Sequence, residues 1–367
     1  MRNSGPFRSV LIFGGAGFIG SNWAHHLLRN TDAQVHVFDN LSRQGVTQNL
    51  ADLRKAAGNS GRLKITIGDV RDYELVNRVV STATDIFNFA AQVAVTTSID
   101  DPRHDFEVNL GGTFNILEAA RLSGNRPFLL FTSTNKVYGD MRSEPLSSTR
   151  WRHEYTKETG TSESQPLDFH SPYGCSKGAA DQYVRDYARI YDLPTVVFRM
   201  SCIAGARQFG NEDQGWVAHF LYSALLDNPL FIYGDGRQVR DVLCVEDLVH
   251  AFEAVRANLK RTAGEIYNVG GGVENTVSLL ELLREIKRFT GCEVRYQFCA
   301  ARPGDQLAYI TDYSKLTQHT GWRPRVSVRG TLERIHDWWL NHRDLFDPQA
   351  PVEAPTAADL QEVREAA

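Results

Sequence analysis

Short apolar runs alternate with amphipathic stretches through the first 200 residues of the chain. The runs SVLIFGG, QVHVFDN, LKITIGDV, DIFNFAA, PFLLFTST and PTVVFRM each predict a short buried strand. Stretches between them, such as GSNWAHHLLRN and LGGTFNILEAARLSG, place apolar residues at helical spacing. Because parallel strands need crossover connections and are buried on both faces, the alternation predicts a doubly wound α/β fold, with helices on both sides of a parallel sheet.

The alternation loosens after about residue 200. Turn clusters such as YGDGRQ and NVGGG stand among short apolar runs and helical stretches such as EDLVHAFEAVRANL and SLLELLREIKRFT. We expect the main sheet in residues 1–198, with a segment at about 241–270 returning to it, and a smaller mixed α/β substrate-binding lobe in 199–240 and 271–346. Residues 347–367 have little to bury, so we expect a frayed tail or a surface helix there.

Composition narrows the classes of partner. The chain has 367 residues, 42% of them hydrophobic and 23% charged, with a net charge of -4, which is typical of a globular protein large enough for two parts. Lysine and arginine are dispersed, so we expect no nucleic-acid partner. The five cysteines form no CxxC pair and have no histidine at ligand spacing, which predicts neither a metal site nor disulfides. The N-terminal apolar run is too short for export or a membrane span, so we expect a cytoplasmic protein with no membrane partner.

A glycine-rich turn, GGAGFIG, follows the first predicted strand and leads directly into a helical pattern. Such a turn brings backbone amides and a helix N-terminus to a pyrophosphate. Asp39 ends the next strand nineteen residues after Gly20, where a carboxylate accepts from a ribose 2′-hydroxyl and repels a 2′-phosphate. NAD is therefore favoured over NADP. Arg43 lies close by and is in principle able to soften this preference, but a solvated arginine is the simpler interpretation.

Further cofactor contacts are predicted where the third and fourth strands end. Asp69 follows the third strand and would either accept from the adenine amino group or cap the next helix. Small side chains and backbone after the fourth strand would line the cofactor. The predicted cofactor-binding residues are Gly14, Gly17, Phe18, Ile19, Gly20, Asp39, Asn40, Asp69, Val70, Ala90, Ala91, Gln92, Asn109, Tyr173 and Lys177.

The stretch HSPYGCSK, residues 170–177, carries candidate chemistry. Ser171 and Pro172 are a good N-cap and first helical residue, so Tyr173 and Lys177, four apart, should project from one helix face. A neighbouring ammonium and a positively charged nicotinamide favour the phenolate, and a fall of about 3 pKa units corresponds to roughly 4 kcal/mol. Tyr173 then becomes a usable general base and acid. YxxxK alone is common on helix surfaces; the glycine turn and a strand that ends in Thr134 give it weight.

Together these motifs carry a family resemblance. GGAGFIG, GDVRD, VNLGGTFNILEAAR, STNKVYGD, SPYGCSK, GDGRQVRDVLCVEDL, YNVGGG and RPGDQ resemble the extended short-chain dehydrogenase/reductase family of nucleotide-sugar epimerases and dehydratases, over nearly the whole chain. The resemblance implies a Rossmann fold, NAD as cofactor, and a homodimer or homotetramer. It also implies that Thr134, Tyr173 and Lys177 form the catalytic set, with the Thr134 hydroxyl bonding the reacting oxygen.

Asn135 and Lys136 separate the two activities of that family. In the 4,6-dehydratases of the family that this chain resembles, Asp and Glu at these two positions expel water from the sugar. An amide and an ammonium cannot do this, so the resemblance implies epimerisation rather than dehydration. STNKVYGD, the long insert before Tyr173 and FRMSCIAGARQFG are similar to the CDP-paratose (CDP-tyvelose) 2-epimerase branch. This implies C2 inversion of a CDP-3,6-dideoxyhexose through a bound 2-keto sugar. Met200 and Ser201 replace the Phe-Asn of common 4-epimerases and count against a UDP-galactose 4-epimerase.

The expected partner is a nucleotide-diphosphate sugar, CDP-linked by the same resemblance. Its diphosphate needs cations, and bidentate arginines suit it best. Other nucleotide-sugar epimerases such as a UDP-glucose 4-epimerase, a nucleotide-sugar dehydrogenase or reductase, and a non-catalytic NAD-binding regulator stay open as alternatives. The residues expected near the substrate are Asn135 and Lys136, with solvated loop positions as their alternative, and Arg207, Gln208, Arg240, Asn268 and Arg302.

Overall fold

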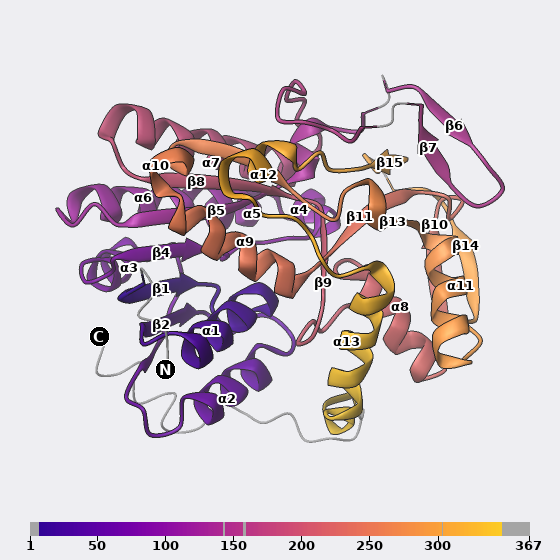
Figure 1. Ribbon diagram of the computed structural model, residues 1–367, viewed down its shortest axis with the longest axis horizontal. Coiled ribbons are helices and arrows are strands. Elements are labelled where there is room, and N and C mark those ends of the chain that lie inside the picture. The colour runs from indigo at the N-terminus through magenta and orange to yellow at the C-terminus, as the bar shows by residue number, and fades with distance from the viewer. Residues whose placement is uncertain (1–6, 142–143, 157–158, 303, 347–367) are drawn as a thin grey trace.

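The computed structural model describes residues 7–141, 144–156, 159–302 and 304–346. Its larger part contains a seven-stranded sheet in which every neighbouring pair of strands is parallel (Figure 1). In sheet order the strands are β12 (Glu265–Val269), β8 (Thr195–Met200), β5 (Phe128–Thr134), β4 (Asp85–Asn88), β1 (Ser9–Phe13), β2 (Gln34–Asp39) and β3 (Leu63–Ile67). Six of them are the predicted apolar runs, which confirms the doubly wound α/β fold.

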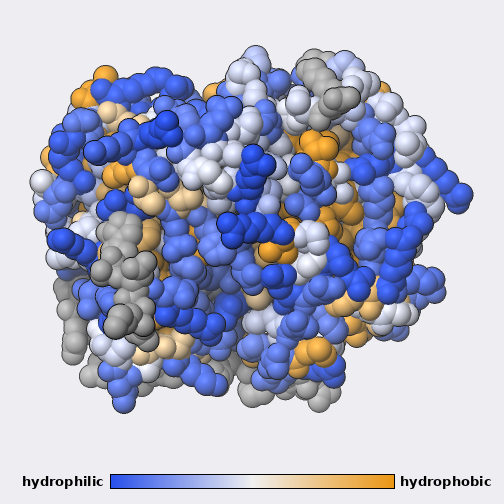
Figure 2. Space-filling model, in the orientation of Figure 1, coloured by the Kyte–Doolittle hydropathy of each residue, from blue (hydrophilic) through white to orange (hydrophobic). Residues whose placement is uncertain are grey.

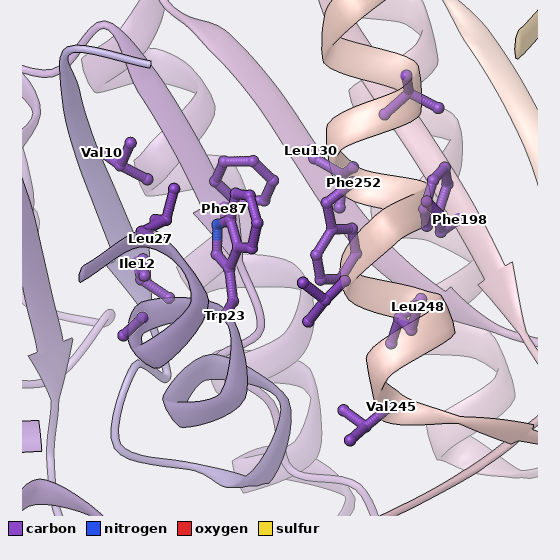
Figure 3. Close-up of a cluster of buried hydrophobic side chains, with 14 of the residues drawn as sticks. Val10, Ile12, Trp23, Leu27, Phe87, Leu130, Phe198, Val245, Leu248 and Phe252 are labelled. Carbon is purple, nitrogen blue, oxygen red and sulfur yellow. The ribbon is translucent and has the colours of Figure 1, made fainter. Parts of the chain in front are cut away.

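Helices cover both faces of this sheet because successive strand residues point to opposite sides. In β1, the side chains of Val10 and Ile12 belong to one core, which also contains Trp23 and is shown in Figure 3. Leu11 and Phe13 belong to the core on the other face. The helices of the first core are α1 (Phe18–Asn30), α2 (Val46–Ala57) and α9 (Val245–Ala257). Those of the second core are α3 (Tyr73–Val80), α6 (Gly112–Leu122) and α7 (Ser171–Tyr191).

A smaller lobe, on the right of Figure 1, packs three helices around a core of its own. These helices are α8 (Trp216–Leu225), α11 (Leu279–Thr290) and α13 (Val328–Leu340). Its strands are β9 (Cys202–Ala204), β10 (Leu230–Tyr233), β11 (Val239–Cys244), β13 (Thr276–Ser278), β14 (Tyr296–Cys299) and β15 (Ala308–Tyr309). Short helices elsewhere are α4 (Val95–Asp100), α5 (Pro102–Phe106), α10 (Leu259–Thr262) and α12 (Ser314–Thr320).

The long insert before Tyr173 connects the two parts. It forms a hairpin of β6 (Leu146–Ser148) and β7 (His153–Tyr155) that lies against the lobe. The backbone amide of His153 donates to the carbonyl of Arg237 at 2.9 Å, and the Tyr155 hydroxyl donates to the carbonyl of Ala308 at 2.8 Å. The insert therefore helps to fix the lobe relative to the sheet.

The segment expected to return to the sheet divides at β11. Helix α9 and strand β12 belong to the larger part, whereas β11 bonds with β9, β13 and β15 of the lobe. We keep the boundaries at 198, 270 and 346 as a proposal and move the one at 240 to 244, so that the return to the larger part begins at α9. The predicted tail, 347–367, lies outside the described residues.

None of the helices in the described ranges combines the length and apolar character needed to cross a bilayer. The face in Figure 2 is covered largely by hydrophilic residues, with apolar residues in smaller groups between them.

Candidate active site

A cavity of about 670 Å³ lies where the parallel strands end, and it reaches residues of the lobe. Its wall includes Gly14 after β1, Asp39 at the end of β2, Asp69 after β3, Ala90 after β4 and Thr134 at the end of β5. Strand order reverses at β1, which has β4 on one side and β2 on the other. Ligands of open α/β sheets bind at such a switch point, outside the carboxyl ends of the strands.

The glycine turn and the start of α1 form one wall of this cavity. Gly14 has a φ of 70°, and a Cβ there would lie 2.7 Å from the backbone nitrogen of Ala90, so only glycine fits. Gly17 occupies the N-cap position, and no side chain caps this 13-residue helix. Its first amides are therefore left at the wall of the cavity, where they fit the pyrophosphate of a dinucleotide.

Asp39 is held in place by backbone amides. Its carboxylate accepts from the amide of Ala16 at 3.0 Å and from the amide of Leu41 at 2.9 Å. Burial raises the pKa of Asp39, while these amides act in the opposite direction. The carboxylate is thus fixed on the cavity wall at the place expected for the ribose hydroxyls.

Asp69 also lines the cavity, but it does not cap a helix. Asp72 is the N-cap of α3 and accepts from the amide of Leu75 at 3.0 Å, so the capping alternative for Asp69 was wrong. The Asp69 carboxylate accepts from Arg71 Nε at 3.0 Å and Nη2 at 2.9 Å. This bidentate pair lowers the pKa of Asp69 and fixes its orientation.

Every predicted cofactor residue lines the cavity except Asn109. Asn109 lies in a π-helical turn, Glu107–Gly111, and is fully buried. Its Nδ2 donates at 3.0 Å both to the carbonyl of Gln92 and to Oδ1 of Asp105. The structure therefore places Asn109 behind the wall, where it fixes the backbone of Gln92.

Thr134, Tyr173 and Lys177 meet at the cavity, although they come from two distant segments. Thr134 is the last residue of β5, and the other two lie one turn apart on α7. Helix α7 begins at Ser171, one residue earlier than expected, with His170 in the N-cap position. The Ser171 hydroxyl still accepts from the amide of the third residue after it, at 3.2 Å.

The pKa values of this set differ from the expectation. Burial raises the pKa of Tyr173 to about 12; a hydrogen bond with Thr134 and the charge of Arg43 act against the rise, and Asp105 adds to it. Burial lowers the pKa of Lys177 to about 7, with Asp105 opposing. In the protein by itself the pKa of Tyr173 is therefore raised, because desolvation is the largest cause for both groups. The lowering expected from Lys177 together with a bound nicotinamide stays a prediction.

Two of the predicted substrate residues, Arg207 and Gln208, line the cavity. The structure pairs three others with the loop that precedes β15. Lys136 Nζ lies 3.4 Å from Oδ1 of Asp305, and Arg240 Nη2 donates to the same oxygen at 2.7 Å. Asn135 Nδ2 donates to Gln306 Oε1 at 3.2 Å. Asn135 and Lys136 therefore link the end of β5 to the lobe, Arg240 shares the Asp305 carboxylate from within the lobe, and none of the three is part of the cavity wall.

Arg302 and Asn268 are also engaged with protein groups. Arg302 Nη2 lies 3.2 Å from Oδ1 of Asp213, on the segment before α8. Asn268 is fully buried; it accepts from the Tyr138 hydroxyl at 2.7 Å and donates to the carbonyl of Thr161 at 2.9 Å. Both ends of its amide are occupied, so the structure gives it a place in the interior.

Several wall residues were not assigned a site role from the sequence. Arg43 lines the cavity, and its Nη2 donates to Gln214 Oε1, from the lobe. Phe209, Thr97 and His104 also line the cavity. Only Arg43 had a local signal, its position four residues after Asp39. Within the described ranges no group of three His, Cys, Asp or Glu side chains could hold a metal ion.

Comparisons with known proteins agree with this geometry. A family model described as GDP-mannose 4,6 dehydratase matches residues 11–335. The CDP-paratose 2-epimerase of Salmonella typhi is 42% identical over 337 residues, which cover 90% of this chain and 98% of that protein.

Solved structures show the same overall arrangement. UDP-glucose 4-epimerase of Thermus thermophilus, in complex with NAD, has a TM-score of 0.75 and 31% identity over 91% of this chain and 99% of that one. A dTDP-glucose 4,6-dehydratase from Streptomyces venezuelae with NAD bound has a TM-score of 0.78 and 31% identity, covering 93% and 99%. The chain therefore belongs to the GDP-mannose 4,6-dehydratase family, among the extended short-chain dehydrogenases/reductases that act as nucleotide-sugar epimerases and dehydratases.

Proposed function

We propose that this protein is an NAD-dependent nucleotide-sugar epimerase that inverts C2 of a CDP-linked 3,6-dideoxyhexose, converting CDP-paratose to CDP-tyvelose. The observation that carries the proposal is the pair after Thr134. Asn135 and Lys136 stand where the family's dehydratases hold a carboxyl pair, and both are bonded to the loop before β15. Neither group can serve as that acid and base. The 42% identity to a CDP-paratose 2-epimerase supports the choice of sugar.

The cavity wall supplies the contacts that NAD requires. The amides at the start of α1 would receive its pyrophosphate, and Asp39 would accept from the adenosine ribose and repel the 2′-phosphate of NADP. NAD bound here would supply a reversible hydride acceptor and would not be consumed over a full turnover. Asn109 acts behind the wall through the backbone of Gln92.

The chain's own part in the reaction is the movement of one proton. Tyr173 Oη takes the proton of the C2 hydroxyl as the 2-keto sugar forms, and returns it after the sugar has presented its other face. The Thr134 hydroxyl bonds the same oxygen and stabilises its charge. Lys177, buried one turn along α7, holds the nicotinamide ribose.

Replacement of Tyr173 by Phe should lower kcat by at least about 10³-fold, because no other group at the C2 oxygen replaces the lost base.

The diphosphate of the substrate lies on the lobe side of the cavity in this proposal. Arg207 already lines the wall there. Arg240 and Arg302 pair with Asp305 and Asp213, and they bind phosphate by exchanging these carboxylates for it. Asn135 and Lys136 keep the end of β5 attached to the loop before β15, which carries Asp305. Cytidine is assigned as the base on the similarity in sequence alone.

We also propose a homodimer formed through α6 and α7. Leu122 and Ile190 are 58% and 65% exposed, and Phe114 and Tyr183 form an exposed edge-to-face pair with ring centroids 5.8 Å apart. Apolar side chains gathered on two adjacent helices are costly to leave in water. Sedimentation of Ile190→Glu should show a monomer where the wild-type protein is a dimer.

A cytoplasmic location stays the prediction drawn from the N-terminal sequence.

The substrate test uses purified protein with CDP-paratose or UDP-glucose, followed by NMR of the products. Formation of CDP-tyvelose supports the proposal, whereas UDP-galactose from UDP-glucose would indicate a 4-epimerase. Accumulation of NADH in proportion to product would indicate a dehydrogenase. Turnover in heavy water gives a further check: the hydrogen at C2 should stay unexchanged, because it moves only between sugar and nicotinamide. Deuterium at C2 would contradict hydride transfer.

A further inference from the structure

Met200 ends β8, and the chemistry proposed above gives it no role. In the sheet it is the register partner of Thr134, the last residue of β5. Side chains at paired positions of neighbouring strands point to the same face, and such strands lie about 4.8 Å apart. Both residues line the cavity. Met200 therefore flanks Thr134 within the cavity.

Strand β5 has a different neighbour on each side. On one side lies β4, and residues 89–94, which follow it, belong to the wall assigned to the cofactor. On the other side lies β8. In the proposed reaction, a sugar whose C2 oxygen is bonded at Thr134 has the nicotinamide toward β4. Its opposite flank therefore faces β8 and Met200.

The wall on that flank offers mainly apolar groups. Cys202 and Ile203, which follow Met200 by two and three residues, also line it. Burial raises the pKa of the Cys202 thiol to about 12, so the thiol stays uncharged at neutral pH and is a weak hydrogen-bond donor. Ser201 carries a hydroxyl, but its proton is committed to Oδ1 of Asp241 at 2.5 Å. A sugar hydroxyl brought to this flank would lose water without gaining a strong partner.

We infer that Met200, together with Cys202, forms the surface that C3 of the sugar faces, and so selects a substrate with no hydroxyl on that carbon. The inference rests on the proposed function, in which the C2 oxygen is held by Thr134 and Tyr173. C1 and C3 both adjoin C2, and they exchange flanks when the sugar turns about its C2–O bond, so C3 faces Met200 in one of the two orientations. A hydroxyl left unpaired there should lower kcat/KM by roughly 10- to 100-fold.

The test compares kcat/KM for C2 inversion of two sugars, with NMR of the products: CDP-paratose, and CDP-6-deoxyglucose, which differs from it by a hydroxyl at C3. Wild type should prefer CDP-paratose by about 10-fold or more. In Met200→Gln, whose amide can donate to that hydroxyl and accept from it, the preference should fall by at least about fivefold. Met200→Leu is the matched control and should keep the wild-type preference, because its side chain stays apolar. Cys202→Ser should fall between them.

The ratio of the two sugars isolates this effect, because a variant that only disturbs the fold, the binding of NAD or the action of Tyr173 lowers both values alike. A preference in Met200→Gln that stays at the wild-type value overturns the inference, and so does wild-type protein that converts both sugars equally well. If Met200→Gln does not fold, Cys202→Ser decides in the same way: a smaller preference supports the inference and an unchanged one overturns it.

A third sugar checks which carbon faces the wall. CDP-3-deoxyglucose carries the additional hydroxyl at C6, and its rate relative to CDP-paratose should be the same in wild type and Met200→Gln. A relative gain for this sugar in place of CDP-6-deoxyglucose would mean that the wall faces C6, and the assignment of C3 would be overturned.

Failure of the proposed function would look different. Wild-type protein that inverts C2 in none of the three sugars would remove the basis of both statements. CDP-paratose converted to CDP-tyvelose, without any preference over CDP-6-deoxyglucose, would overturn selection by Met200 alone.

Discussion

On the cofactor side of the cavity, the wall includes short segments that follow β1 to β4 directly, and backbone amides hold Asp39 in place there. On the substrate side, two of the expected groups are long cations that lie outside the cavity lining and pair with carboxylates: Arg240 with Asp305, and Arg302 with Asp213. The first wall is fixed by backbone geometry. The second has ion pairs between side chains behind it, which a phosphate can displace without any change in the backbone.

The difference suits a cofactor that stays and a substrate that leaves. NAD, neither consumed nor released in the proposed reaction, needs a site that is complete before it binds. A nucleotide sugar must enter and leave in every cycle, and ion pairs of modest strength satisfy the arginines in the meantime. The comparison therefore predicts that substitutions on the cofactor side alter the fold, whereas substitutions on the substrate side alter the response to ligand.

The largest effect is expected for Gly20→Val. A Cβ at this position would overlap the carbonyl oxygen of Gly14 and lie 2.6 Å from Cα of Gly15. The strand and helix would have to separate, and we expect unfolding to become easier by about 3 kcal/mol or more. Urea denaturation measures this loss.

The matched control for that substitution is Gly111→Ala. Gly111 has an ordinary helical φ of -60°, and its nearest heavy atom would be 3.9 Å away. Its stability should change by less than about 1 kcal/mol, because the added methyl group makes only an ordinary van der Waals contact. Equal losses in the two variants would mean that the turn is not held as described.

A smaller effect of opposite sign is expected for Lys177→Met. Lys177 is 3% exposed, and burial lowers its pKa from 10.5 to about 7. The folded protein therefore binds fewer protons than the unfolded chain between these two values, and this residue opposes folding most below pH 7. Replacement by Met should raise the free energy of unfolding by about 2 kcal/mol at pH 7, although it removes the contact of Nζ with the Phe131 ring at 4.1 Å.

Thermal unfolding from pH 6 to pH 10 checks the sign. The stability gained by Lys177→Met should shrink as the pH rises from 7 toward 10.5. Near 10.5 the unfolded wild-type chain itself loses the Lys177 proton, so folding no longer has to remove it. Lys287→Met, on the surface, is the control and should show no such trend. A variant less stable than wild type at pH 7 would mean that Lys177 contributes to the fold.

The two walls also differ in how far they follow from sequence. Six strands, the glycine turn and Asp39 were predictable because each depends on neighbours a few residues away. The partners of Lys136 and Asn268 were not, since Asp305 and Thr161 lie 169 and 107 residues away along the chain. Asn109 was misplaced for a similar reason: a π-helical turn, which no local pattern indicated, turns it toward Asp105. Local motifs identify side chains, and the tertiary structure decides whether they face the ligand.

The smallest effect is expected for Asp305→Asn, on the substrate side. Its carboxylate is shared by Arg240 and Lys136, and without it the two cations face each other. Because this carboxylate is about a third exposed, at 33%, we expect a loss of only about 1 kcal/mol in the free energy of unfolding. CDP should then stabilise the variant more than it stabilises the wild type, since its diphosphate supplies the missing negative charge.

Thermal shift with CDP and with NAD separates the two walls in this variant. The shift caused by CDP should grow, and the shift caused by NAD should stay at the wild-type value, because Asp305 does not line the cofactor wall. Asp227→Asn, which removes a carboxylate from an exposed pair with Arg295, is the control and should leave both shifts unchanged. A smaller response to CDP in Asp305→Asn would mean that the carboxylate holds Arg240 ready for the nucleotide and does not compete with it, and the exchange of partners proposed for this wall would have to be given up.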